Sequence, residues 1–184
     1  LTFPSLSDVS GDVYIHRGTH FETVSLPALQ TVTGKLHFFA QELDLIELGS
    51  LVRVDGDFIV LSYQGVSLLL PELQQVGGDL DLAQTKLTSL NLPKLSDIGG
   101  LRFWNNGWIQ TLGSWPAFQN VTLQQGLYIF SNNQLADLAP LVGIVAIDED
   151  FEVRNNAALP TTSVEALHQS IAIGGTVTIS GNAN

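Results

Sequence analysis

Aspartates recur beside glycine along this chain, and they are the first residues whose type and spacing could do chemistry. Asp12, Asp57, Asp79 and Asp150 each follow or lie near a glycine, and Asp81 comes two residues after Asp79. Two carboxylates about 5 to 9 Å apart can cleave a glycosidic bond by general acid and base catalysis. Aspartate beside a turn glycine is more often a solvated turn residue, and we favour that interpretation.

Histidines and acids could also bind a metal ion. His16 and His37 are expected to be diagonal neighbours on the outward face, and His20 follows in the nearby turn, but no acidic third ligand stands at a defined spacing. Solvent-exposed histidines are therefore favoured over a metal site. The chain also lacks the glycine-rich nonapeptide series that binds calcium in β-rolls. We expect no metal and no cofactor.

Composition excludes one class of partner. The 184 residues include 18 acidic and 7 basic side chains, for a formal net charge of -11, and no local basic patch is visible. Such a chain repels a phosphate backbone, so nucleic acid is not expected as a partner. Cysteine is absent, which excludes disulfides and thiolate chemistry. Because methionine is absent too, we interpret residues 1–184 as one domain from a longer precursor.

A repeat of about 22 residues must position these side chains. Residues 34–57, GKLHFFAQELDLIELGSLVRVDGD, and residues 77–100, GGDLDLAQTKLTSLNLPKLSDIGG, share one template of glycine, alternating apolar residues, a polar turn and a leucine-rich segment. The first apolar position falls at Val13, Leu36, Phe58, Leu80, Leu101, Leu127, Phe151 and Val177, with spacings of 23, 22, 22, 21, 26, 24 and 26. Units this short cannot close a core alone, so neighbouring copies must stack.

The pattern within each copy predicts short strands separated by turns. Proline has no N–H for a strand ladder and is expected at corners of the coil, at Pro27, Pro71, Pro93 and Pro116. Three asparagine pairs follow the first strand of successive copies and are expected to form an internal ladder of hydrogen bonds: Asn105–Asn106, Asn132–Asn133 and Asn155–Asn156.

Residues 161–172, TTSVEALHQSIA, break the strand pattern. Val164, Leu167 and Ile171 share one face at helical spacing, and Thr162 with Glu165 fits a capping box. We expect a short helix here that covers the side or the end of the stack. At the opposite end, the chain starts inside a repeat with no capping element, so strand edges there are expected to be exposed.

The repeat resembles the receptor L-domain family. The copies VSGDVYI, VDGDFIV and VGGDLDL, the LPxL segments, the NN turns and the ending GGTVTISGN carry the resemblance over nearly all 184 residues. It is closest to cysteine-free members on bacterial surfaces and in fungal cell walls. The resemblance implies an all-β dominated, right-handed parallel β-solenoid of about eight coils with a short C-terminal helix, located outside the cell, at its surface or in its envelope. It also implies ligand binding without catalysis, but transfers no hormone-binding residue, because the animal receptors' disulfides are absent.

Side chains between the inward apolar positions must point outward. One outward column reads Tyr14, His37, Ile59, Asp81, Arg102, Tyr128, Glu152 and Thr178, and the next reads His16, Phe39, Leu61, Ala83, Trp104, Phe130, Arg154 and Ser180. Aromatic and aliphatic side chains gather where solvent is expected, which is typical of a recognition surface. The candidate binding residues are Tyr14, His37, Phe39, Leu61, Arg102, Trp104, Tyr128 and Phe130.

Other interpretations of this apolar stripe stay open. The last residue of each strand could turn into the core, the insertion at 107–125 could fold over the sheet, or the stripe could serve self-association, as could the N-terminal end. Within the insertion, Trp115 replaces a core leucine of the LPxL segment and is expected to be packed. Asn120 begins a glycosylation sequon, which has meaning only in a eukaryotic secretory setting.

Together these features favour an extracellular or cell-surface binding module that is not an enzyme and that recognises a protein or a glycan. A structural scaffold of the cell wall or envelope, without a dedicated ligand, is the main alternative. A polysaccharide-degrading enzyme is a further one, because such enzymes can carry stacked carboxylates on a parallel β-helix.

Overall fold

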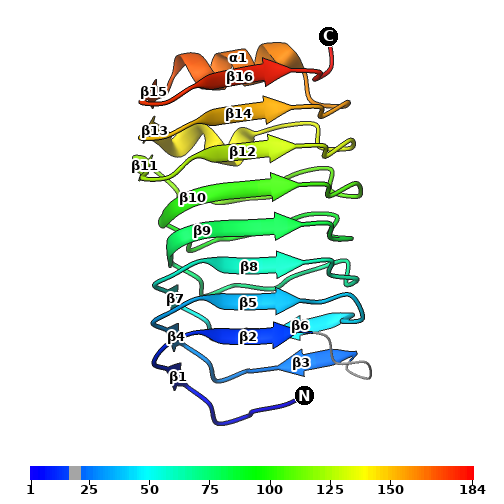
Figure 1. The fold of residues 1–184 in the computed structure, drawn as a ribbon, viewed down its shortest axis with the longest axis vertical. Helices are drawn as coiled ribbons and strands as arrows, with labels where there is room; N and C mark the ends of the chain where they lie inside the picture. Colours follow the sequence, from blue (N-terminus) through cyan, green and yellow to red (C-terminus); the bar gives the residue numbers. More distant parts are fainter. Residues whose placement is uncertain (17–21) are drawn as a thin grey trace.

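The fold is a β-solenoid of parallel strands (Figure 1), seen in a computed structural model that describes residues 1–16 and 22–184. The strands are β1 Asp8–Val9, β2 Val13–His16, β3 Thr23–Ser25, β4 Thr31–Val32, β5 Leu36–Phe39, β6 Leu45–Glu47, β7 Arg53–Val54, β8 Phe58–Leu61, β9 Gln75–Ala83, β10 Asp97–Trp104, β11 Val121–Leu123, β12 Leu127–Phe130, β13 Ile144–Ile147, β14 Phe151–Arg154, β15 Ala172–Ile173 and β16 Val177–Ser180. The expected strand-dominated solenoid is thus confirmed.

One side of the solenoid is formed by the first strand of each copy, and we call these the front strands. Within the described residues they are β2, β5, β8, β9, β10, β12, β14 and β16, which pair in parallel in this order and form the row of arrows in Figure 1. Their register places the first apolar residue of every copy in one column, from Val13 to Val177. The alignment of the eight copies from sequence is therefore confirmed.

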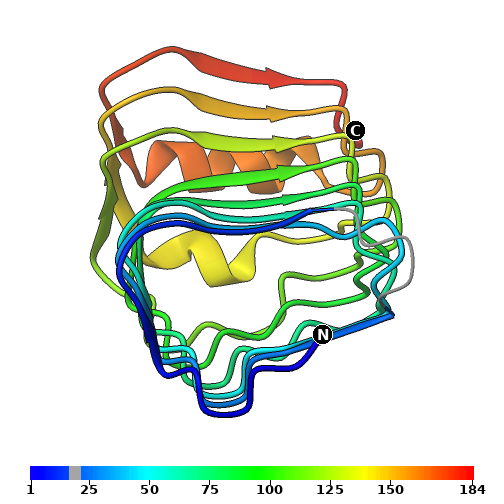
Figure 2. The same cartoon turned by 60° about the horizontal axis from the view of Figure 1, so that its bottom comes forward.

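Shorter strands form the other two sides of the coil (Figure 2). On the second side, β1, β4 and β7 pair in this order, and β7 pairs in turn with the first residues of β9. Further along the chain, β11, β13 and β15 form a separate sheet on this side. On the third side, β3 pairs with β6, and single bridges join Glu47 to Leu69 and Ser89 to Thr111. The three sides enclose one continuous cluster of buried apolar side chains.

The prolines lie where the coil turns, as predicted. Pro27, Pro71, Pro93 and Pro116 are all exposed and each begins a two-residue turn. In these turns the residue two positions after the proline donates its backbone N–H to the carbonyl of the residue before the proline, as Leu73 does to Leu70 at 3.3 Å. Proline suits this position because its ring presets the backbone angle and its missing N–H is not needed. The residues on either side of each turn are buried in the core, and they are leucines except at Pro116, where Trp115 and Phe118 take their place.

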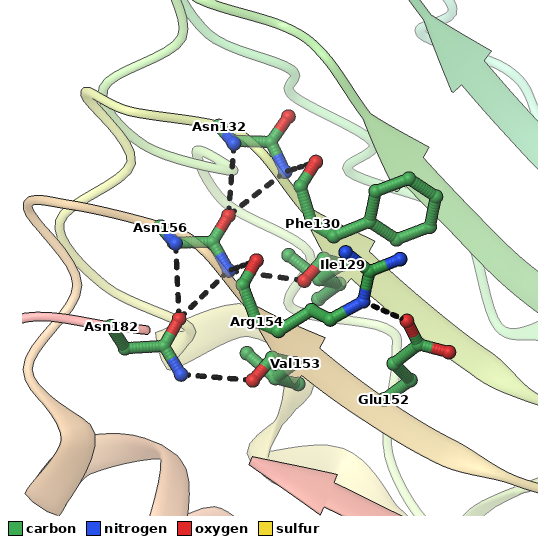
Figure 3. A network of polar contacts seen from close by, with 8 residues as sticks. All are labelled: Ile129, Phe130, Asn132, Glu152, Val153, Arg154, Asn156 and Asn182. Atoms are coloured by element: carbon green, nitrogen blue, oxygen red, sulfur yellow. Dashed lines mark hydrogen bonds and ion pairs between the residues drawn. The ribbon is translucent and has the colours of Figure 1, made fainter. Parts of the chain in front are cut away.

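Asparagines form a buried ladder next to the front strands (Figure 3). The side-chain Oδ1 of Asn132 accepts the backbone N–H of Asn106 at 3.0 Å. Asn156 and Asn182 repeat this contact for the next copies, as Figure 3 shows. Each side-chain Nδ2 donates to a carbonyl of the preceding copy, as from Asn132 to Phe103. The ladder was expected, but in the pair Asn132–Asn133 the first residue enters it, whereas the other two pairs contribute the second.

A column of left-handed residues explains that difference. The residue just before each ladder asparagine has a positive φ: Asn105, Ser131 and Asn155 at 56° to 59°, and Gly181 at 65°. This conformation turns the chain sharply out of the strand and points the next side chain inward. Asparagine tolerates it better than most residues, so in the pairs Asn105–Asn106 and Asn155–Asn156 the first asparagine serves the turn and the second the ladder, whereas Ser131 serves the turn before Asn132.

The C-terminal helix is present, but its predicted capping box is wrong. Helix α1, Thr161–Gln169, buries Val164 and Leu167 and lies behind β16 at the end of the stack (Figure 1). It begins directly after Pro160, without a side-chain hydrogen bond at the cap, because the backbone N–H of Thr161 instead donates to Ala183 at 2.7 Å. A short 3₁₀ helix, η1 at Ala139–Gly143, was not predicted. Neither helix, in the part of the chain described, is long and apolar enough to cross a membrane.

Candidate recognition face

The outward side of the front strands carries all eight candidate binding residues, and we call it the recognition face. The register joins Tyr14 to His37 and Arg102 to Tyr128 in one column, and Phe39 to Leu61 and Trp104 to Phe130 in the next. Both predicted columns are therefore confirmed. Tyr14 is 54% exposed, and the other seven candidates are half-buried.

Two interpretations that would have hidden the stripe do not describe this structure. In the second column Ala83 is buried, but Phe39, Leu61, Trp104 and Phe130 keep part of their surface exposed, so these strand ends do not turn into the core. The insertion at 107–125 follows the path of the coil rather than crossing the recognition face, because Ile109, Leu112 and Phe118 point into the core. Trp115 is buried, as expected, and its indole N–H donates to the carbonyl of Leu90 at 2.9 Å.

Three stacked groups form the C-terminal half of the recognition face. The rings of Trp104 and Phe130 are 5.9 Å apart and nearly parallel, at 21°. The guanidinium of Arg154 lies 4.6 Å from the centre of the Phe130 ring, and Arg154 is held in turn by an ion pair with Glu152 (Figure 3). We call Trp104, Phe130 and Arg154 the stack. Its members come from three successive front strands, so the backbone ladder sets their spacing.

The indole of Trp104 also reaches across to the preceding strand. Its Nε1–H donates to Oδ1 of Asp81 at 3.2 Å, although Asp81 belongs to β9 and Trp104 to β10. The residue beside Trp104 in its own column is Ala83, which is small enough to leave room for this approach. Ala83 is fully buried as a result, and Asp81 is half-buried.

Burial under this ring changes the chemistry of Asp81. Loss of solvent raises the pKa of its carboxyl from 3.8 to about 6. The hydrogen bond from Trp104 and the charge of Arg102 lower the pKa, but they do not offset burial, while the charges of Asp79 and Asp57 raise it further. A strongly perturbed carboxyl among aromatic and basic groups is a frequent mark of a functional site.

The aspartates beside glycine make backbone contacts across copies. Asp12 accepts the backbone N–H of Lys35 at 2.7 Å, Asp57 that of Asp79 at 3.0 Å, and Asp150 that of Thr176 at 2.7 Å. Burial tends to raise the pKa of Asp57, but its hydrogen bond and ion pair with Lys35 and its bond to the backbone leave the pKa lower than usual. These carboxylates hold successive turns together.

Every cation on the recognition face is paired within the part of the chain described. Lys35 lies 2.8 Å from Asp57, Arg102 forms an ion pair with Asp79, and Arg154 pairs with Glu152. The guanidinium of Arg102 also lies 4.6 Å from the centre of the Tyr128 ring. By contrast, Oδ2 of Asp81 has no hydrogen-bond partner among these residues.

Four rings cluster at the N-terminal half of the recognition face. The rings of His16 and His37 are 4.7 Å apart, edge to face, with Tyr14 5.8 Å from His37 and Phe39 6.3 Å from His16. His16 is exposed, but His37 is half-buried, and its Nε2 is shut off from solvent without a hydrogen-bond partner. The prediction of solvent-exposed histidines is thus wrong for His37, because the neighbouring rings cover it.

Burial, followed by the charges of His16 and Lys35, lowers the pKa of His37. No group of three histidine, cysteine, aspartate or glutamate side chains suited to a metal ion occurs in residues 1–16 and 22–184. His20, considered above as a metal ligand, lies outside the described residues.

Sequence reasoning missed part of this site. Arg154 stands in the second predicted column but was not among the candidates, and Asp81 and Glu152 were expected only as charged residues at the rim of the apolar patch. Their columns were visible in the repeat, whereas the lean of Trp104 toward Asp81 was not.

A separate depression of about 250 Å³, lined by Trp115, Pro116, Pro140 and neighbouring residues, lies between the insertion and η1. It shares no residue with the recognition face.

Comparison with known proteins adds no assignment for this chain. No protein-family model, curated protein or solved structure matches it.

Proposed function

We propose that this protein is a binding module without catalytic activity, which recognises a protein or a glycan through the recognition face, outside the cell or at its surface. The observation that carries the proposal is the row of partly exposed Phe39, Leu61, Trp104 and Phe130 on one side of a rigid sheet. A surface that only faced solvent would be expected to carry polar side chains at these positions. The resemblance to receptor L-domains supports the same class of function and the same location.

The rings of the recognition face are held in place before any ligand arrives. The Trp104 indole is fixed by its hydrogen bond to Asp81 and by stacking on Phe130, and Phe130 is fixed by Arg154. Binding therefore has little side-chain entropy to remove, which for a mobile side chain costs about 0.5–1.5 kcal/mol. Preorganised aromatic and arginine side chains of this kind dominate the binding energy of many interfaces.

The engaged state of the carboxylates supports the proposal that the protein is not an enzyme. A glycosidase needs one ionised carboxylate that is free to act as base or nucleophile beside a protonated one. Asp81 has the raised pKa of an acid, but its neighbours Asp57 and Asp79 are occupied by backbone and by cations. The site also lies on an open sheet rather than in a cleft that would exclude water.

The proposal can be tested with paired tryptophan variants. Trp104→Ala and Phe130→Ala remove ring surface from the recognition face, whereas Trp108→Ala removes a tryptophan that is 58% exposed and lies outside the front strands. Wild type and variants are compared on a glycan array and on a panel of purified cell-surface proteins. We expect saturable binding that both face variants weaken more than tenfold and that Trp108→Ala leaves within twofold.

Thermal unfolding of the same variants separates binding from folding. The rings of Trp104 and Phe130 are half-buried, so each truncation should lower the free energy of unfolding by about 1–2 kcal/mol and leave the fold intact. Binding that survives in both face variants would place the site elsewhere. The absence of any saturable ligand on either panel would favour the structural scaffold instead.

A further inference from the structure

The size of the apolar row restricts the kind of ligand it suits. Phe39 and Phe130 are separated by four strand spacings, or about 19 Å, and the neighbouring outward column is about 7 Å away. The row is thus about 19 Å long and one side chain wide, so by itself it supplies only a small part of the roughly 800 Å² that each partner contributes to a stable protein interface. A slender chain fits this row better than a globular protein.

The charges of the recognition face restrict the ligand further. Lys35, Arg102 and Arg154 each already pair with a carboxylate, which offsets the positive charge that would attract a sulfate, phosphate or carboxylate. An anionic ligand would have to compete with these carboxylates and would meet an acidic protein. What the face does offer is Oδ2 of Asp81, an oxygen that can accept a hydrogen bond and has no partner among the described residues.

The surroundings of Trp104 combine an apolar surface with this acceptor. Phe130 stacks on one side of the indole, and in the column on the other side the next residue is Ala83, so no large side chain of that column stacks there. Asp81 lies at the indole Nε1 edge. Sugar rings need both parts of this arrangement, because they present apolar C–H faces and hydroxyl groups around their rims.

We propose that the ligand of the recognition face is an uncharged glycan chain that lies along the row from Phe39 to Phe130, with one sugar ring against Trp104 and one of its hydroxyls donated to Asp81. The inference rests on the proposed function and names its ligand. An extended peptide is disfavoured, because peptides that bind sheets add to a strand edge, and the recognition face presents side chains instead of free backbone groups.

Binding should then depend on the protonation of Asp81. The charged groups that face its carboxyl are Asp79 from the same strand, Arg102 from the next copy and Asp57 from the preceding copy. When the carboxyl gains its proton, it loses the anionic acceptor that the sugar hydroxyl uses. The glycan should therefore dissociate more readily as pH falls through about 6.

The test uses defined hexasaccharides in NMR and calorimetric titrations of the full chain. Neutral probes are the hexamers of β-1,4-glucose, β-1,3-glucose, N-acetylglucosamine and mannose, and anionic probes are hexagalacturonate and a heparin hexasaccharide. We expect at least one neutral probe to bind at pH 7.5 and to shift the indole N–H signal of Trp104. Trp104→Ala should weaken this binding more than tenfold and Trp108→Ala less than twofold.

Asp81→Asn tests whether the carboxylate accepts a hydrogen bond from the sugar, and it leaves the packing nearly unchanged. It should weaken binding about three- to tenfold at pH 7.5, the usual worth of one hydrogen bond, and should remove the loss of affinity that wild type shows at pH 5. Asp8→Asn, a change at an exposed residue of β1, should do neither.

The outcomes separate this inference from the proposed function. Failure of every neutral probe to bind at millimolar concentration, or binding of the anionic probes alone, would overturn the glycan inference. Saturable binding of a purified protein that requires Trp104 would then leave the proposed function standing. If neither glycans nor proteins bind in a manner that requires the face, both are wrong.

Discussion

Replacing Asp81 by asparagine should make the protein more stable at neutral pH. The carboxyl is half-buried beneath Trp104, and burial raises its pKa from 3.8 to about 6. The ionised form is therefore held in the folded protein at a cost in free energy. Asparagine has nearly the same shape, keeps an oxygen to accept the indole N–H, and carries no charge.

The size of the effect follows from the pKa. A rise of about two units, at about 1.4 kcal/mol each, gives an upper bound of about 3 kcal/mol. Asp81 keeps part of its surface in water, so we expect a gain of about 1–2 kcal/mol in the free energy of unfolding. For a chain of this length that corresponds to a rise of about 2–8 °C in Tm.

The pH dependence gives the effect its sign. The folded protein binds the Asp81 proton more tightly than the unfolded chain does, so the free energy of unfolding falls as pH rises from about 4 to about 6. The cost is fully present above pH 6 and absent below about pH 4. The gain from Asp81→Asn should consequently be complete at pH 7.5 and vanish near pH 4.

Thermal and urea unfolding of wild type, Asp81→Asn and Asp8→Asn at pH 7.5, 5.5 and 4 would measure this difference. Asp8→Asn at an exposed site should change the free energy of unfolding by less than about 0.5 kcal/mol. If Asp81→Asn has no effect or is destabilising at pH 7.5, or if its gain persists at pH 4, the account of Asp81 is wrong. A gain in stability together with a loss of binding would show that the carboxylate is kept for function.

Three further substitutions examine other parts of the structure. Asn132→Ala should lower the free energy of unfolding by about 3–5 kcal/mol, because it leaves buried partners of the ladder unpaired, and urea unfolding would reveal a smaller loss if water replaces the side chain. Ala83→Leu should push the Trp104 indole off its acceptor, lowering the pKa of the uncovered carboxyl, and an unchanged carboxyl titration by NMR would contradict this packing. His16→Gln should raise the pKa of His37, since a neighbouring charge is removed. Because the folded protein binds the His37 proton less tightly than the unfolded chain does, acidification below the usual pKa of histidine lowers the free energy of unfolding, and this loss should be smaller in the variant. An unaltered NMR titration of His37 would show that burial alone lowers its pKa.

Much of the recognition face could be predicted because a repeat converts sequence spacing into position. Once copies stack with one residue opposite its equivalent, two columns follow from alternation alone, and all eight candidate residues lie where the columns place them. The capping box predicted at Thr162 lies outside the repeat, so the stacking of copies gave no check on it. Helix α1 starts at the residue whose N–H finds the Ala183 carbonyl, and that partner comes from a distant part of the chain.

By itself, then, the sequence determined the repeat, the coil, the corners, the buried asparagines and the residues that share the outward columns. All of these depend on local backbone preference and on a period that every copy obeys. Only the tertiary structure decided which outward side chains touch. A small Ala83 in one copy lets Trp104 of the next copy lean over Asp81, and the same lean covers the carboxyl and raises its pKa. Contacts of this kind depend on the sizes of neighbours from different copies, and no single repeat contains that information.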